Sequence, residues 1–217
     1  MSGRAVAALL LCPLALLTSF VTWGLVLLAR GVPKEELGAT LQDAPTIPVV
    51  LGFGLALLVL RKFARQDGFS LATLGWATPK LADLGVAALL GVPFVALNSF
   101  LLFPRLVELD PSFDPQLRAI SLPAAIVTFI VSVVAEETIY RGYALEVLRT
   151  RRSVPVVIAL TSVGYALLAP GTNLAPKAWA LLFGIFLAAL RLWRGSLWPG
   201  ALIHLAASLA PKIMSGG

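Results

Sequence analysis

The sequence predicts an all-α protein, a polytopic bundle of about seven transmembrane helices. Hydrophobic residues make up 59% of the 217 residues and charged residues only 13%, whereas a water-soluble domain carries roughly a quarter charged residues. The apolar residues also form long continuous runs separated by short polar connectors. A transmembrane β-barrel would instead show alternating segments of about ten residues. Such a chain cannot cover a water-exposed surface, and only helices suit runs of this length.

The apolar runs that we expect to span the membrane are residues 5–29, 45–60, 84–104, 120–147, 154–170, 177–192 and 196–211. Crossing the hydrocarbon takes about 20 helical residues, so the shorter runs are only marginally long enough. The first run is too long and too weak in cleavage signals for a signal peptide, and we expect it to be retained. The sequence indicates one integral membrane domain in two parts. Residues 1–119 hold amino-terminal helices and connectors, and residues 120–211 hold the core helices.

The charge and cysteine content limit which partners, disulfides and metal sites the protein can have. The net charge of +6 comes with no basic stripe interleaved with aromatic residues, so we expect no nucleic-acid partner and assign the charge to connectors at the membrane surface. Ten basic residues fall in connectors on the side of the amino terminus and six on the opposite side. This bias predicts a cytoplasmic amino terminus. A single cysteine, Cys12, excludes an internal disulfide and a cysteine-rich zinc site.

The stretch "VVAEETIYRGYA" (residues 133–144) places charges inside the fourth apolar run. A charged residue at the centre of a spanning helix costs about 2.5–3.5 kcal/mol, so it normally faces a protein interior or a wet cavity and is paired. Glu137 and Arg141 are four residues apart, with the acid first, and are expected to pair on one helix face. Glu136 is turned about 100° away and is therefore the carboxylate available for chemistry. The alternative is a buried ion cluster that only stabilises helix packing.

The one histidine of the chain, His204, lies in the last apolar run, and Ser208 follows on the same helix face. The alternative is a packing role, with Ser208 bonded to the backbone carbonyl four residues earlier. Glu137 lies 12 residues before Arg149 and His204 lies 10 residues after Arg194, which places both roughly 15–18 Å from the same membrane face. We therefore predict that a glutamate and the imidazole meet as a general base and a polarising partner.

Three stretches, "EETIYRG", "YALLA" and "SLWPGALIHLAAS", together resemble the three motifs of the CPBP family. This family comprises the type II CAAX prenyl proteases and the bacteriocin-processing and immunity-type (Abi) membrane proteins. The resemblance covers about residues 120–210. It implies an intramembrane metalloprotease in the plasma membrane of a prokaryote, which acts on a hydrophobic peptide or membrane-protein substrate among membrane lipids. The oligomeric state is left open.

The resemblance also implies roles for individual residues. Glu136 would activate a water molecule, with Glu137 and Arg141 supporting the site. His204 and Ser208 would stabilise the oxyanion or hold a metal. A divalent metal such as zinc would then be bound by Glu136 and His204.

Two positions depart from the family pattern. Ala169 stands where the second motif has histidine, and Ser208 stands where the third has asparagine or aspartate. Alanine neither binds metal nor transfers a proton, so hydrolysis is expected to be reduced or lost. A catalytic zinc site uses three protein ligands and a water, and with Glu137 paired to an arginine a tight site is not expected. Asn98 or Asn173 could add a polar group, although nothing in the sequence places either there.

Three functions stay open at this point: an active protease, an inactive family member that acts as a membrane binding or immunity protein, and a small ion-coupled transporter. The transporter ranks last because neither a series of polar residues across several helices nor an internal repeat is evident.

Overall fold

The computed structural model describes residues 3–43, 45–109, 120–169 and 173–214. Within these ranges the regular structure is helical throughout, with no strand, and the predicted all-α bundle is confirmed. The elements are α1 (Gly3–Ala29), α2 (Leu37–Asp43), α3 (Thr46–Gln66), α4 (Leu81–Leu97), η1 (Asn98–Leu102), α5 (Phe103–Leu109), α7 (Leu122–Glu136), η2 (Glu137–Ala144), α8 (Leu145–Arg149), α9 (Val154–Ala166), α10 (Leu174–Arg194) and α11 (Trp198–Met214).

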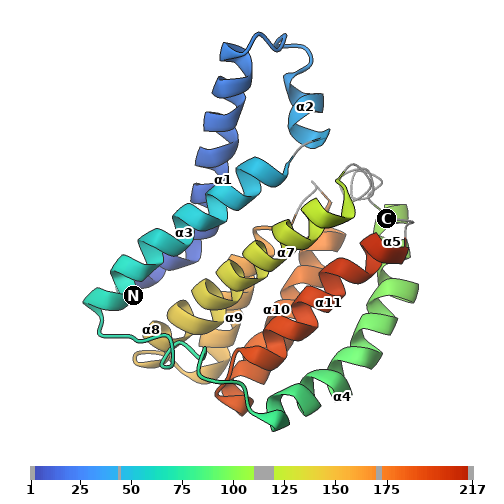
Figure 1. Cartoon of the computed structure of the whole chain (residues 1–217). Helices are drawn as coiled ribbons and strands as arrows, with labels where there is room; N and C mark the ends of the chain where they lie inside the picture. The colour runs from blue at the N-terminus through green and yellow to red at the C-terminus, as the bar shows by residue number, and fades with distance from the viewer. Residues whose placement is uncertain (1–2, 44, 110–119, 170–172, 215–217) are drawn as a thin grey trace.

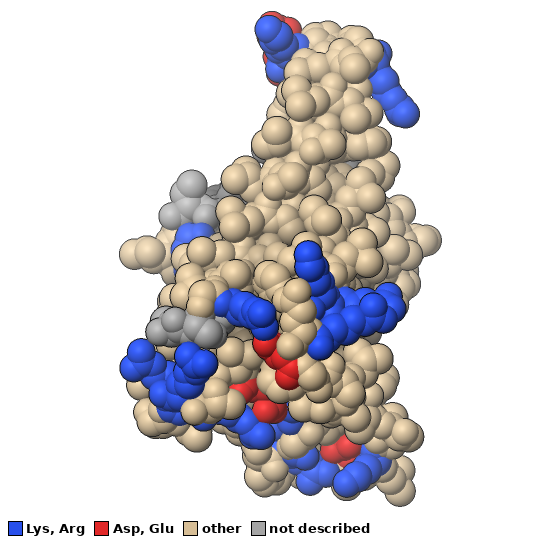
Figure 2. Space-filling model, turned by 90° about the vertical axis from the view of Figure 1, so that its left-hand side faces the viewer, with Lys and Arg blue, Asp and Glu red and all other residues tan. Residues whose placement is uncertain are grey.

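Five of the described helical segments are long and apolar enough to cross a membrane: Val6–Ala29, Thr46–Gln66, Leu81–Leu109, Leu122–Arg149 and Leu174–Arg194. Figure 2 shows a band without charged side chains between the charged tip of the molecule and its charged lower half. Each of the seven predicted runs coincides with a helix, but α9 has 13 residues and α11 has 17. Of the seven predicted spans, five are therefore long enough to cross the membrane, and the other two are shorter helices.

The early end of α9 corrects the predicted run 154–170, because the helix stops at Ala166. Pro170 follows Ala169 in the sequence, and the residue before a proline is disfavoured in helical conformation. Ala169, the degenerate position of the second motif, consequently lies just beyond the end of the helix.

The helices form one bundle in which α7 packs between α3 and α11, and α11 packs between α7 and α4 (Figure 1). Helices α9 and α10 pack against each other, and α1 packs along α3 and against η2. The amino-terminal helices thus rest directly on the core helices, although the division at residues 119 and 120 stays a prediction.

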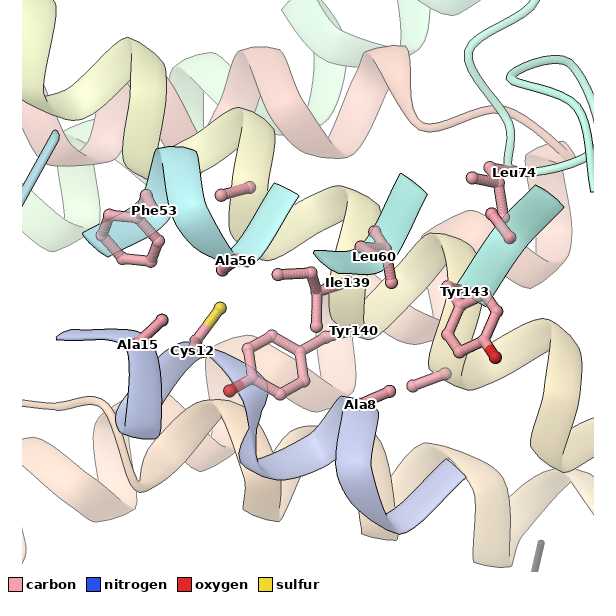
Figure 3. Packing of buried hydrophobic residues seen from close by; sticks show 13 residues of the cluster. Ala8, Cys12, Ala15, Phe53, Ala56, Leu60, Leu74, Ile139, Tyr140 and Tyr143 are labelled. Atoms are coloured by element: carbon pink, nitrogen blue, oxygen red, sulfur yellow. The ribbon is translucent and has the colours of Figure 1, made fainter. Parts of the chain in front are cut away.

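A cluster of buried apolar side chains joins α1, α3 and η2 (Figure 3). Small residues on α1 and α3 bring these helix backbones close together, as is usual for helices packed in membranes. Cys12 is fully buried in this cluster and fills space there. The labelled members are Ala8, Cys12, Ala15, Phe53, Ala56, Leu60, Leu74, Ile139, Tyr140 and Tyr143.

The motif stretch itself departs from the regular α-helix that its spacing suggests. Residues Glu137–Ala144 form a π-helix, and all eight are buried. A π-helix closes hydrogen bonds from residue i to i+5, and such segments occur frequently at functional sites. Gly142 allows this turn to approach the connector before α4, since a Cβ there would lie 3.1 Å from the Leu74 carbonyl oxygen.

Candidate active site

The two adjacent glutamates lie at the junction of α7 and η2, near the middle of the continuous segment Leu122–Arg149. At 1.5 Å per residue this position is about 20 Å along the helix from either end. The polar cluster is therefore enclosed at mid-bundle depth, where unpaired charge is costly.

Glu137 pairs with Arg141, as the spacing predicts. The carboxylate Oε1 lies 3.4 Å from Arg141 Nη1, and the two side chains are 1% and 0% exposed. None of the three guanidinium nitrogens has a hydrogen-bond partner among the described residues, so the contact is an ion pair without hydrogen-bond geometry. The guanidinium carbon also lies 4.2 Å from the centroid of the Tyr165 ring, and this cation–π contact supplies a second attraction.

His204 on α11 joins both glutamates. Its Nδ1 lies 2.9 Å from Glu137 Oε1, and its Nε2 lies 3.6 Å from Glu136 Oε2. The expected meeting of carboxylate and imidazole therefore occurs. However, Glu137, which was expected to serve Arg141 alone, also accepts the direct hydrogen bond from the imidazole. Residue spacing within one helix predicted the first partner, whereas the second depends on how α11 packs against η2.

His204 Nε2 has a further contact, with Tyr165 on α9. The Tyr165 hydroxyl oxygen lies 3.1 Å from Nε2, and the two rings meet edge to face at a centroid distance of 5.6 Å. The motifs do not single out Tyr165 as a site residue, because the second motif asks only for an aromatic ring. The phenolic hydroxyl, on a helix whose other polar side chains are Thr161 and Ser162, was the signal that could have found it.

These groups open onto a cavity of about 360 Å³. Glu136, His204 and Tyr165 line it, and so do the two degenerate positions, Ala169 and Ser208. Aromatic rings form much of the remaining wall, supplied by Phe94, Phe103, Phe129, Trp179 and Phe183. The cavity is thus a largely apolar chamber of a size that holds a small ligand, and its lining includes the ionisable side chains of Glu136 and His204.

The remaining candidates have structural contacts. Ser208 Oγ donates to the His204 carbonyl oxygen at 3.0 Å, which is the alternative that the sequence left open. Asn173 caps α10 by accepting from the Ala175 amide and does not line the cavity. Asn98 lines the cavity and donates to the Ala207 carbonyl oxygen at 3.3 Å.

The four ionisable side chains of the cluster can reach neutrality together. Arg141 is positive and Glu137, bound to it, is negative. Glu136 and His204 then form a neutral pair when they hold one ionising proton between them. Burial of net charge is strongly unfavourable, and the pairing of Glu137 with Arg141 leaves Glu136 and His204 as the groups of the cluster available for proton transfer. A carboxylate and an imidazole that exchange one proton are suited to acid–base catalysis.

The donor set does not fit the implied metal. Both imidazole nitrogens have protein partners, Glu137 at Nδ1 and Tyr165 at Nε2. Among the described residues, no group of three or more His, Cys, Asp or Glu side chains could hold a metal ion, whereas catalytic zinc needs three protein ligands. The predicted ligation by Glu136 and His204 therefore lacks a third protein ligand.

Fold and site together define a polytopic helical membrane protein with a polar cluster enclosed inside its bundle. Residues 118–210 match the family model described as type II CAAX prenyl endopeptidase Rce1-like. The match spans the three motif stretches, and these residues are similar to the CAAX protease family, in agreement with the predicted resemblance. No curated protein and no solved structure matches the chain.

Proposed function

We propose that the protein is an intramembrane endopeptidase of the CAAX-protease type, in which Glu136 is the general base that activates water. One observation carries the proposal: Glu136 and His204 line the same cavity, with Oε2 and Nε2 3.6 Å apart. The neighbouring acid, Glu137, is neutralised by Arg141, so Glu136 is the carboxylate left for proton transfer.

In the proposed reaction, the Glu136 carboxylate removes a proton from a water molecule in the cavity as the water oxygen bonds to the scissile carbonyl carbon. The carbonyl π electrons move to its oxygen, and the positive charge of the protonated His204 imidazole stabilises this oxyanion. When the C–N bond breaks, the proton on Glu136 passes to the departing amine nitrogen. Glu137 holds the imidazole through Nδ1 and stabilises its charge.

The substrate that suits this chamber is a hydrophobic peptide or a segment of a membrane protein, because the wall around Glu136 and His204 is largely aromatic. We also propose that the protein lies in the plasma membrane of a prokaryote with its amino terminus in the cytoplasm. The excess of basic connector residues on that side supports the orientation.

A second candidate function is an inactive family member that binds a membrane partner. Two observations favour it: Ala169 brings no functional group to the cavity, and the Ser208 hydroxyl donates to a backbone carbonyl rather than into the cavity. The cavity would then be a binding site rather than a reaction chamber.

The test is cleavage of a panel of hydrophobic peptides by the purified protein, compared between wild type and Glu136→Gln. Loss of a general base lowers turnover by about 10²–10⁴-fold, so Glu136→Gln should fall close to background. Glu108→Gln is the matched control, because the Glu108 side chain is 61% exposed on α5, and it should cleave like wild type. Equal background turnover by wild type and Glu136→Gln would favour the inactive alternative. Ion flux into proteoliposomes that is lost in Glu137→Gln would instead favour the transporter.

A further inference from the structure

Tyr165 occupies the centre of the site although the family motif requires only its ring. It lies on the last turn of α9, between the guanidinium of Arg141 and the imidazole of His204. The ring centroid lies 4.2 Å from the Arg141 guanidinium carbon, while the hydroxyl oxygen lies 3.1 Å from His204 Nε2. Ring and hydroxyl therefore have separate partners, and the hydroxyl contact is additional to what an aromatic residue alone would provide.

We infer that the Tyr165 hydroxyl takes over from the histidine missing at position 169: it is the positioning residue that fixes the His204 imidazole, and it supplies a polar group to the cavity beside Glu136. What the fixed imidazole does in turnover rests on the proposed function.

The hydrogen-bonding roles of the two imidazole nitrogens support this role of Tyr165. The Glu137 carboxylate only accepts, so Nδ1 carries the hydrogen that bonds to it. In neutral His204, Nε2 is then an acceptor, and the Tyr165 hydroxyl is the donor that satisfies it. When His204 is protonated, Nε2–H donates to the phenolic oxygen, whose own hydrogen is then free to point into the cavity. Because a hydroxyl rotates and can both donate and accept, Tyr165 serves both protonation states.

Fixing the imidazole needs both contacts. With Glu137 and Tyr165 on opposite nitrogens, a flip of the ring would place C–H groups against a carboxylate and a hydroxyl and lose both hydrogen bonds. Without the hydroxyl, Nε2 would keep only Glu136 Oε2 at 3.6 Å, which is beyond hydrogen-bond distance, beside the Phe183 ring, whose centroid lies 5.2 Å from that of His204. An unsatisfied buried nitrogen is costly, so the ring would be less firmly held.

The position of the hydroxyl also matches the missing group. Tyr165, in the last turn of α9, and Ala169, just beyond the end of this helix, line the same cavity as Glu136. A histidine at position 169 would bring a polar side chain into this space from the same end of α9. Ala169 leaves that space without a functional group, and the Tyr165 hydroxyl is the polar group that α9 supplies in its place.

The chain offers a clean probe, because His204 is its one histidine. Protein labelled with ¹⁵N-histidine in detergent micelles gives a single imidazole, and its two nitrogen resonances can be compared between variants at fixed pH. Tyr165→Phe keeps the ring over Arg141 and removes only the hydroxyl. Tyr140→Phe is the matched control, since the Tyr140 hydroxyl bonds the Leu9 carbonyl oxygen rather than His204.

We expect Tyr165→Phe to shift the Nε2 resonance and Tyr140→Phe to leave it unchanged. An Nε2 resonance that is the same in Tyr165→Phe and wild type would overturn the inference.

Turnover tests the functional part. Tyr165→Phe should lower kcat roughly tenfold, the loss expected for one neutral hydrogen bond, with little change in KM. The double variant Tyr165→Phe/Ala169→His should regain turnover. A shifted resonance with unchanged kcat would overturn the catalytic contribution of Tyr165. Absence of turnover in wild type would refute the proposed protease, whereas the resonance comparison would still decide whether Tyr165 positions His204.

Discussion

At the residue scale, the pair formed by Arg141 and Glu137 sets the charge of the site. Arg141 is fully buried, and the 3.4 Å contact to Glu137 is not accompanied by hydrogen-bond geometry. Its attraction therefore depends on charge and on the Tyr165 ring rather than on a fork of directed hydrogen bonds. Such a pair is sensitive to loss of one partner, because the charge left behind stays buried.

Replacing Arg141 by methionine should lower the free energy of unfolding by about 3–5 kcal/mol, since Glu137 would lose its counter-charge in the interior. The matched control is Arg105→Met. Arg105 pairs with Glu108 at 2.7 Å, but these side chains are 76% and 61% exposed, so the loss should be about 0–1 kcal/mol. Thermal unfolding in detergent micelles measures both. If Arg141→Met/Glu137→Gln is no more stable than Arg141→Met, the buried charge is not the source of the cost.

Ala169→His restores the expected residue of the second motif at a position that lines the cavity. We expect higher turnover of a hydrophobic peptide or measurable uptake of zinc, because the imidazole would add a third group beside Glu136 and His204. Peptide cleavage and metal content of the purified protein are the measurements. A folded variant with neither gain would show that position 169 does not correspond to the second-motif histidine.

At the element scale, α1 packs closely against α3 and also packs against η2. Gly52 on α3 faces α1, and a Cβ added there would lie 2.7 Å from Ser19 Oγ and 3.1 Å from the Leu16 Cα. The backbone atom cannot move without displacing α1, which also contacts η2. Gly54, two residues further along the same helix, has nothing within 4 Å of its Cβ position.

Gly52→Ala should therefore destabilise the protein by about 1–3 kcal/mol through overpacking. Gly54→Ala should be neutral or stabilising by up to about 1 kcal/mol, because alanine is favoured over glycine in a helix. Melting temperatures of the two variants in the same detergent give the comparison. Equal effects at both positions would mean that the α1–α3 contact is looser than the structure indicates.

Two side-chain contacts show where predictions from regular helical spacing hold and where they fail. The i, i+4 spacing of Glu137 and Arg141 predicted their pairing, which holds although the segment is a π-helix. The same spacing predicted Ser208 beside His204, yet the Ser208 hydroxyl bonds the backbone of its own helix. Spacing along a helix determines which side chains share a face, but a short hydroxyl side chain can satisfy itself locally.

At the scale of the whole molecule, the distribution of basic residues predicts the orientation in the membrane. Arg30 and Arg61 are both exposed: Arg30 directly follows the span Val6–Ala29, and Arg61 lies in the carboxyl-terminal part of the span Thr46–Gln66. Single-cysteine variants Arg30→Cys and Arg61→Cys can be labelled in intact cells with a membrane-impermeant maleimide. Because the native Cys12 is fully buried, the wild-type protein serves as the unlabelled control.

With a cytoplasmic amino terminus, Arg30→Cys should be labelled in intact cells and Arg61→Cys only after the membrane is permeabilised. The physical reason is the preference of basic connectors for the cytoplasmic side. The reverse labelling pattern would invert the proposed orientation and would place the Glu137 and His204 helices the other way up.

The sequence by itself determined the helical membrane fold, the pairing of Glu137 with Arg141, and the resemblance of about residues 120–210 to the CPBP family. These properties depend on local quantities, namely the hydropathy of continuous runs, the separation of residues along one helix, and short motifs. Only the tertiary structure decided that His204 bonds Glu137 more closely than Glu136, that Tyr165 reaches the second imidazole nitrogen, and that Ala169 lies beyond the end of α9. Contacts between helices depend on their mutual rotation and distance of approach, which are set by packing across the bundle and leave no signature in the spacing of residues along any one helix.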